Sequence, residues 1–368
     1  MKIQSIRAFH SIQPFVDGPY RMSKGRVADC FDSLIVAITA GNGVTGWGEM
    51  APLGTFYSAA FASGARAGIA EIAPHLIGLD PRGLSTLGRL MDTVFKGHPY
   101  IKSAIDMAAC DLAARAADVP LATFFGGIES DTAPIYCVVT HGTPDSMAEH
   151  AIRLTKSGVD RIQVKVGGDV RGDIERLHAV AGVVPKGTVI FCDANAGWTV
   201  FQARQFADAT RNVDYVFEQP CPTIDDNLSL RRSSDKPMVL DESVQSLADL
   251  LEIHHKGAAD GITLKISRLG GVSNTRKLRD LAVDLGLMVT VEDTGGAEID
   301  TAAMAHLSLS TPVERRMHTI AFHEWVTIKT ARNAPPTWVN KIGIPEGAGL
   351  GIDVDEDLLG KPFGVWGV

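Results

Sequence analysis

GITLKISRLGG, residues 261–271, is one of six segments in which a short apolar run ends in an ionisable residue. The others are RIQVKVGG (161–168), VIFCDANAGW (189–198), YVFEQP (215–220), PMVLDES (237–243) and MVTVEDTGG (288–296). Consecutive apolar positions are typical of a parallel strand that is buried on both faces. The ionisable residues follow one another in steps of 28, 25, 23, 24 and 28 positions, each about the length of one strand and one helix.

This spacing predicts eight strands in the second part of the chain. We expect them at residues 133–140, 161–166, 189–193, 215–218, 238–241, 261–265, 288–293 and, with a weak pattern, 317–322. Helix-compatible stretches such as 145–156 and 173–183 lie between them, and eight such units predict an α/β fold, a closed (β/α)8 TIM barrel. A doubly wound open sheet is the alternative, but no glycine-rich phosphate fingerprint follows the first strand.

The N-terminal region has a different organisation. Alternating residues predict strands at 2–10, 33–39 and 44–49, and helical spacing predicts helices at 59–76 and 100–117. Strands followed by helices indicate an α+β unit. We therefore predict a capping domain at 1–130, a barrel at 131–345 and a C-terminal tail at 346–368 that packs back on the cap.

Composition excludes several classes of partner. The net charge is −8 and no Lys/Arg run is present, so nucleic acid and membrane surfaces are not expected partners. No run of about 18 apolar residues and no apolar signal core occurs. The five scattered cysteines form no CxxC pair, which predicts reduced core thiols in a cytoplasmic protein.

The ionisable strand ends predict one catalytic site, because the C-terminal ends of barrel strands meet at a common mouth. In chain order the residues are Lys165, Asp193, Glu218, Asp241, Lys265 and the pair Glu292/Asp293. Three carboxylates from adjacent strands repel one another unless a cation joins them, and all-oxygen ligands favour Mg²⁺ over zinc. The flanking lysines are expected to face each other across the metal, where a lowered pKa would let them act as bases. Any one of these residues alone could be a helix cap or a surface residue. Five consecutive strands that each end in an ionisable residue favour a catalytic metal site.

The motifs resemble the enolase superfamily, in its mandelate racemase/muconate lactonizing branch, over essentially the whole chain. Asp193-x-Asn195, Glu218-Gln219-Pro220 and Asp241-Glu242-Ser243 are similar to the three metal-ligand motifs of that family. The GWGE of residues 46–49 resembles its capping hairpin, and residues 103–127 resemble its long signature helix, with Arg115 where Lys is common. This resemblance implies Mg²⁺ as cofactor, Lys165 and Lys265 as catalytic residues, and a homo-oligomer.

The resemblance also points to a subgroup. Lys265 on the sixth strand replaces the His–Asp pair of enzymes like mandelate racemase, and only the second lysine of a KxK motif remains, since Gln163 stands at the first. Losing that neighbouring charge is expected to raise the pKa of Lys165. The DGPY of residues 17–20, GWGEMAP (46–52), GHPYIKSAID (97–106) and VEDTGG (291–296) resemble members that act on proline-like acids. In the betaine epimerases among them a Trp stands at the position of Gly295, and its loss favours a secondary amine.

The implied reaction is dehydration of cis-3-hydroxy-L-proline to Δ1-pyrroline-2-carboxylate. Lys165 would remove the α-proton, giving an enediolate held by the metal, while Lys265 protonates the departing hydroxyl. Asp293 would suit the substrate ammonium. The other expected substrate-binding residues are Glu292, Asn195, Tyr20, Phe56, Tyr57, Thr294 and Gly295, with Phe15 a further closing residue; His318 and His323 are expected in the core.

Other functions stay open at this point. The same lysines would epimerise a hydroxyproline or proline betaine at carbon 2, and a dipeptide epimerase or a cycloisomerase is a third possibility. A dipeptide epimerase would be expected to keep the lysine that is absent at Gln163. A barrel that only binds a ligand would be expected to have lost a lysine or a carboxylate. A purely structural protein would not keep five ionisable strand ends.

Overall fold

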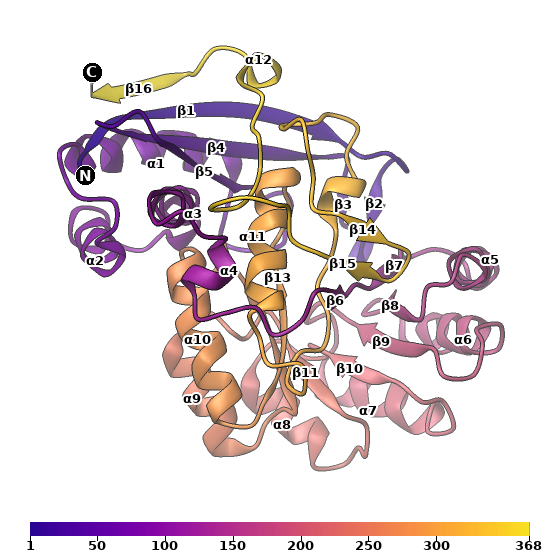
Figure 1. Ribbon diagram of the computed structural model, residues 1–368. Helices are drawn as coiled ribbons and strands as arrows, with labels where there is room; N and C mark the ends of the chain where they lie inside the picture. Colours follow the sequence, from indigo (N-terminus) through magenta and orange to yellow (C-terminus); the bar gives the residue numbers. More distant parts are fainter. Residues whose placement is uncertain (368) are drawn as a thin grey trace.

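The computed structural model describes residues 1–367 as two sheet systems joined by helices (Figure 1). The first is a four-stranded antiparallel sheet in the order β16(Gly364–Gly367), β1(Ile3–Pro14), β4(Cys30–Ala40) and β5(Thr45–Met50). Three of its strands overlap the segments predicted at 2–10, 33–39 and 44–49, and differ from them at the ends. The last strand of the chain pairs with the first, so both termini lie at this sheet.

Two helices pack against the sheet, α1(Ala62–Ile72) and α3(Pro99–Ala116), and α2(Leu84–Val94) packs on these two helices. The approach of α3 to β5 requires glycine. A Cβ on Gly46 would come within 2.2 Å of the Ala108 carbonyl oxygen, and one on Gly48 within 2.0 Å of the Ala104 carbonyl oxygen. The helix predicted at 59–76 is shorter, because Pro74 lies in a separate 3-10 turn, Ala73–Leu76.

The second system is a curled parallel sheet of seven strands. In spatial order it contains β7(Cys137–Val139), β8(Arg161–Lys165), β9(Val189–Asp193), β10(Val216–Glu218), β11(Met238–Leu240), β12(Gly261–Lys265) and β13(Met288–Glu292). The outer helices are α5(Pro144–Lys156), α6(Val170–Ala181), α7(Val200–Ala209), α8(Ile224–Arg231), α9(Leu247–Lys256), α10(Val272–Asp284) and α11(Glu298–Leu309). The predicted fold class, a TIM-type barrel with an α+β cap, is confirmed.

The eighth strand differs from the prediction at 317–322. Residues 316–319 form only two isolated bridges, Val289 with Arg316 and Ile135 with Thr319. These bridges join β13 to the segment before β7, so the segment closes the ring without a continuous ladder. Pairing stops because the chain turns into the 3-10 helix η3(Phe322–Glu324). The predicted first strand is likewise divided into β6(Ala133–Pro134) and β7.

Short elements complete the described chain. They are η1(Ser23–Gly25), β2(Tyr20–Arg21) paired with β3(Val27–Ala28), α4(Leu121–Phe124), the hairpin β14(Thr337–Trp338) and β15(Lys341–Ile342) beside β6, and α12(Glu356–Leu359). Cys110, Cys192 and Cys221 are buried, whereas Cys30 and Cys137 are half-buried, so two of the predicted core thiols lie nearer the surface. None of the helices in residues 1–367 is long and apolar enough to cross a membrane.

Buried carboxylates join the cap to the barrel. Glu49 of β5 is fully buried, and its Oε2 accepts hydrogen bonds from the backbone N–H groups of Ala297 and Asp300 at the start of α11. Asp106 of α3 accepts from the Ser273 N–H at the start of α10. Helix N-termini expose unpaired N–H groups and favour negative charge, so each carboxylate fixes the cap over one barrel helix.

Candidate active site

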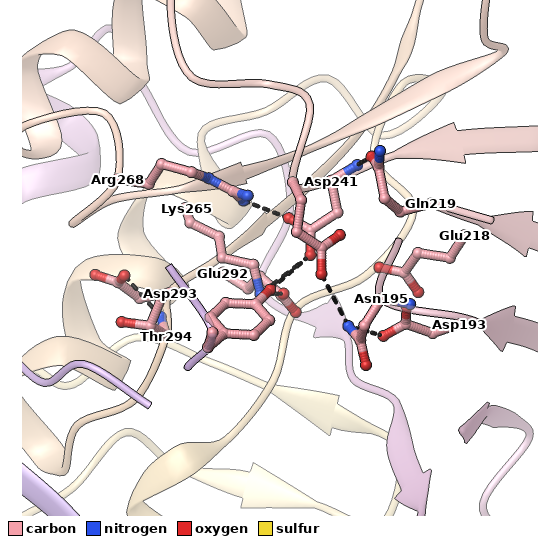
Figure 2. A network of polar contacts seen from close by, with 12 residues as sticks. Asp193, Asn195, Glu218, Gln219, Asp241, Lys265, Arg268, Glu292, Asp293 and Thr294 are labelled. Atoms are coloured by element: carbon pink, nitrogen blue, oxygen red, sulfur yellow. Dashed lines mark hydrogen bonds and ion pairs between the residues drawn. The ribbon is translucent and has the colours of Figure 1, made fainter. Parts of the chain in front are cut away.

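The strand register brings the predicted site residues to the mouth of the barrel. Lys165 is the Cα partner of Asp193, Asp193 that of Glu218, and Lys265 that of Glu292. Register partners in a sheet project their side chains to the same face. Asp241 directly follows β11, and Figure 2 shows its carboxylate beside those of the neighbouring strands.

Each predicted catalytic lysine is buried and paired with carboxylates. The Lys165 Nζ lies 2.5 Å from Asp193 Oδ2, and the Lys265 Nζ pairs with Glu292 and lies 3.4 Å from Asp241 Oδ2. Burial alone would lower the pKa of both ammonium groups, but these carboxylates outweigh it and raise the pKa of each lysine above its ordinary value. The sequence predicts a lowered pKa for lysines beside a bound metal ion, and this stays a prediction. A cation on the same carboxylates would reduce the stabilisation that raises both pKa values here.

Asp241 contacts cationic side chains of the barrel and a side chain of the cap. It pairs with Arg268 (Figure 2). It also accepts a hydrogen bond of 2.9 Å from the Tyr57 hydroxyl. Burial would raise the pKa of Asp241, but Arg268 and Lys265 overcome this effect and lower it. Tyr57 belongs to the cap, so the cap contributes directly to the environment of this carboxylate.

The loops after β9 and β10 are held in position by amide side chains. Asn195, with a left-handed φ of 46°, donates from Nδ2 to Asp193 Oδ2 at 2.8 Å and to Glu242 Oε1 at 3.0 Å. The Gln219 side-chain oxygen accepts from the backbone N–H groups of Asp241 and Ser243 at 2.8 and 3.2 Å. Asparagine tolerates left-handed backbone better than most residues, which explains its use in this tight turn.

The charge balance of the site fits a divalent cation. Five carboxyl groups meet three cationic side chains: Asp193, Glu218, Asp241, Glu242 and Glu292 against Lys165, Lys265 and Arg268. With all five carboxyl groups ionised, two negative charges would be uncompensated. Burial and the neighbouring carboxylates raise the pKa of Glu218 well above its ordinary value and that of Glu242 to about 8. A divalent cation would remove the repulsion that causes these shifts.

Within residues 1–367 no three acidic, histidine or cysteine side chains already stand close enough together to hold one ion. The reason lies in the ion pairs, because Lys165 engages Asp193 while Lys265 and Arg268 engage Asp241. Asp193, Glu218 and Asp241 nevertheless form an all-oxygen donor set on three adjacent strands, which is the chemistry that Mg²⁺ prefers. Their role as ligands stays a prediction that this donor set supports.

A cavity of about 30 Å³ lies over these groups. Both lysines line it, together with Asp193, Asn195, Glu292 and Gln163. The cap and the segment after the barrel supply its apolar wall, which is formed by Tyr20, Met22, Phe31, Leu53, Tyr57, Phe322 and Trp325. The Lys165 Nζ lies 5.9 Å from the Tyr20 ring centre and the Lys265 Nζ 5.0 Å from that of Tyr57, so each lysine faces one aromatic side chain of the cap.

A second cavity of about 260 Å³ adjoins the first. Tyr20, Val138 and Trp325 line both, and the rings of Tyr20 and Trp325 lie 5.3 Å apart. The backbone on either side is tied together, since the Val16 N–H donates to the Trp325 carbonyl at 2.8 Å. These two aromatic side chains therefore form a partition between the catalytic cavity and a larger chamber.

The residues predicted to contact substrate fall into two groups. Tyr20, Tyr57, Asn195, Glu292, Asp293 and Thr294 line the catalytic cavity. Asp293 accepts hydrogen bonds on both oxygens, from Ser267 and from the Thr294 N–H, so its carboxylate is already engaged. Thr294 donates to the Ala51 carbonyl at 2.6 Å. Their binding roles stay predictions.

The second group does not line the catalytic cavity. It consists of Phe56, which is exposed, Phe15, which lines the larger chamber, and Gly295. A Cβ on Gly295 would come within 2.3 Å of the Phe31 ring, so this ring occupies the space that a larger side chain would need. His318 and His323 are buried, as expected of core residues.

Four residues near the lysines were not predicted. Arg268 follows Lys265 by three positions, and a second cation in KISR was the available signal. Tyr136 donates its hydroxyl to Glu292 Oε2 at 2.5 Å, and Gln163 donates to Glu218 Oε2 at 2.7 Å. The sequence around Tyr136 and Trp325 contains no motif that indicates a site. Their positions at the cavity depend on contacts with distant parts of the chain.

Comparisons with known proteins agree with this geometry. Residues 146–358 match the family described as enolase C-terminal domain-like, and residues 6–126 match the N-terminal domain of mandelate racemase/muconate lactonizing enzyme. The chain is 38% identical to the cis-3-hydroxy-L-proline dehydratase of Roseibium aggregatum, over 98% of this chain and 99% of that protein. It is 26% identical to an N-succinyl-L-Arg/Lys racemase of Bacillus cereus, over 98% and 97%.

Solved structures give the same result. A mandelate racemase/muconate lactonizing enzyme from Roseovarius nubinhibens superposes with a TM-score of 0.94 at 35% identity, covering 100% of this chain and 99% of that one. A member of the enolase superfamily from the same organism, complexed with magnesium, gives a TM-score of 0.93 at 34% identity and covers 100% of both chains.

Proposed function

The chain belongs to the mandelate racemase/muconate lactonizing enzyme branch of the enolase superfamily, and within it we propose an Mg²⁺-dependent dehydratase of cis-3-hydroxy-L-proline. One observation carries the proposal: two buried lysines, from β8 and β12, line a single small cavity beside the carboxylates of β9, β10 and β11. The 38% identity to a dehydratase of this substrate supports the choice.

The lysines are placed to act from two sides of a substrate. Lys165 reaches the cavity from β8 and Lys265 from β12, with three strands between them in the sheet. In cis-3-hydroxy-L-proline the hydroxyl and the α-hydrogen lie on opposite ring faces. Lys165 takes the α-proton, and Lys265 gives a proton to the hydroxyl as the C–O bond breaks. Water leaves, and the enamine tautomerises to Δ1-pyrroline-2-carboxylate.

Asp193, Glu218 and Asp241 would hold the cation. Mg²⁺ bound there supplies positive charge that stabilises the substrate carboxylate as negative charge moves onto it. Glu292 holds Lys265 in the cavity through their ion pair, and Tyr136 orients Glu292. The aromatic wall excludes water, which strengthens these electrostatic interactions.

The comparisons favour a proline-like acid over a dipeptide or an N-succinyl amino acid. Relatives named for those larger substrates share 26–30% identity with the chain, below the 38% of the dehydratase.

A 2-epimerase of hydroxyproline or proline betaine is the second candidate. The same two lysines would remove and return the α-proton on opposite faces of a substrate without a leaving group. The rings of Tyr20, Tyr57, Phe31 and Trp325 around the cavity favour it, because aromatic faces bind a quaternary ammonium.

The test is incubation of the protein with Mg²⁺ and cis-3-hydroxy-L-proline in D₂O, followed by proton NMR. Formation of pyrroline-2-carboxylate that stops on chelation of Mg²⁺ is the expected result. Deuterium at Cα without this product would favour the epimerase over the dehydratase, and proline betaines would then be tested as substrates. Absence of both product and exchange would reject the assignment to proline-like acids.

A further inference from the structure

Gln163 presents an unpaired amide oxygen at the catalytic cavity. It precedes Lys165 by two positions on β8, so both side chains project from the same face of the strand. Its Nε2 donates to Glu218 Oε2 at 2.7 Å. As a ligand of the proposed cation Glu218 would be ionised and could only accept hydrogen bonds, which sets the end of the amide that faces it. The Oε1 atom is therefore turned away; the side chain is 3% exposed, and Oε1 has no partner in the described chain.

The other side-chain acceptors at the cavity are largely committed. Glu292 and Asp293 already accept hydrogen bonds on both oxygens. In residues 1–367, the buried side-chain oxygens that line this cavity without a partner are Gln163 Oε1 and Asn195 Oδ1. Asn195 lies beside Asp193 and Gln163 beside Glu218, both predicted ligands of the cation, so position on the strand separates the two. Gln163 shares a strand with the lysine that takes the α-proton, and the substrate nitrogen is bonded to that same α-carbon.

We propose that Gln163 Oε1 accepts a hydrogen bond from the protonated ring nitrogen of the substrate and so selects acids with a free, charged α-nitrogen. The inference rests on the proposed function and specifies the nitrogen chemistry that the site takes. A secondary ammonium has two N–H donors and no lone pair, which matches a buried carbonyl oxygen. A buried acceptor without a donor is unfavourable, so the site discriminates against a ring with oxygen in place of nitrogen.

Calorimetric titration of the Mg²⁺-loaded protein tests this without turnover. The ligands are L-proline and (S)-tetrahydrofuran-2-carboxylate, which differ only in the ring NH₂⁺ or oxygen. The wild type is expected to bind L-proline at least about 10-fold more tightly, since a hydrogen bond to a charged donor corresponds to about a 10- to 100-fold change in affinity. Gln163→Met should lose most of this preference, and Gln163→Lys should reverse it by repelling the ammonium.

The ratio of the two affinities on one protein cancels any loss of Mg²⁺ occupancy in a variant. Equal binding of both acids by the wild type, or no binding of L-proline, would overturn the inference. If Gln163→Met lowered the affinity for both ligands by the same factor, the inference would also be overturned, since Gln163 would then act through Glu218. A wild type that prefers L-proline but releases no water from cis-3-hydroxy-L-proline leaves the inference standing and rejects the dehydratase.

Discussion

The Tyr57 hydroxyl of the cap donates a hydrogen bond of 2.9 Å to Asp241 Oδ2 at the end of β11, across 184 positions of the sequence. The centre of the tyrosine ring also lies 5.0 Å from the Lys265 Nζ. One cap residue therefore contacts both a predicted metal ligand and a predicted acid. The cap therefore contributes directly to the environment of both groups.

Replacement of Tyr57 by Phe tests this contact. The ring stays and the hydroxyl is lost, so Asp241 loses one partner that orients it. Removing such a supporting contact typically weakens metal binding about 10- to 100-fold. Mg²⁺ affinity from calorimetry should fall within that range while the thermal unfolding midpoint changes little. Tyr100→Phe is the matched control, because the Tyr100 hydroxyl has no partner in the described chain; equal Mg²⁺ affinities in the two variants would contradict the prediction.

Alanine at each catalytic lysine should separate the two proton transfers. Lys165→Ala should lower both Cα deuterium exchange and dehydration by about 10²- to 10⁴-fold, the usual contribution of a general base. Lys265→Ala should lower dehydration to a similar extent but leave Cα exchange measurable, because Lys165 still reaches the α-proton. NMR in D₂O reports both rates. Lys277→Ala, at an exposed lysine, is the control. If Lys265→Ala lost Cα deuterium exchange and Lys165→Ala retained it, Lys265 would be the base and Lys165 the acid.

Trp325 should set the size limit of the substrate. Its ring separates the catalytic cavity of about 30 Å³ from the chamber of about 260 Å³, so Trp325→Ala joins them. We expect the variant to exchange the α-proton of trans-4-phenyl-L-proline, a larger acid that keeps the charged ring nitrogen and that the wild type should leave unchanged over the same period. Trp338→Ala, at a tryptophan that is 54% exposed, should behave as the wild type. Exchange of the larger acid by the wild type would show that the partition opens without mutation.

Stability should fall in mild acid because of His306. Its Nδ1 accepts from the Ala122 N–H at 3.1 Å and its Nε2 donates to the Leu350 carbonyl at 3.2 Å, which requires the neutral ring. Burial lowers the pKa of His306 from 6.5 to about 4. The unfolded chain thus binds the proton first, and the stabilisation present above pH 6.5 is lost as the pH falls towards 4. Between pH 7 and 5 the loss from this residue is about 2 kcal/mol.

Urea unfolding of His306→Asn at both pH values measures this contribution. The variant should be about 1–3 kcal/mol less stable at pH 7, since it loses the bond to Leu350, and the gap should narrow by about 2 kcal/mol at pH 5. His318 and His323 titrate in both proteins, so their contributions cancel. A gap that stays constant with pH would show that His306 is not the titrating group.

The sequence by itself determined the barrel, the cap and the identity of the ionisable strand ends. Apolar runs buried on both faces admit little besides parallel strands, and their regular spacing requires a helix between each pair. The C-terminal ends of all barrel strands lie at the mouth of the barrel. The sequence therefore identified the residues at these ends as site candidates: Lys165, Asp193, Glu218, Asp241 and Lys265.

Only the tertiary structure decided which groups meet there. Arg268 on Asp241, Tyr136 on Glu292 and the orientation of Gln163 follow from distances across strands and from the position of the cap. The same holds for the raised pKa of both lysines, which depends on the carboxylates that each one contacts. The local sequence pattern determines helices and strands, because backbone hydrogen bonding and apolar burial repeat at regular intervals along the chain. Contacts between side chains of distant segments follow no such repeat, so only the folded chain specifies them.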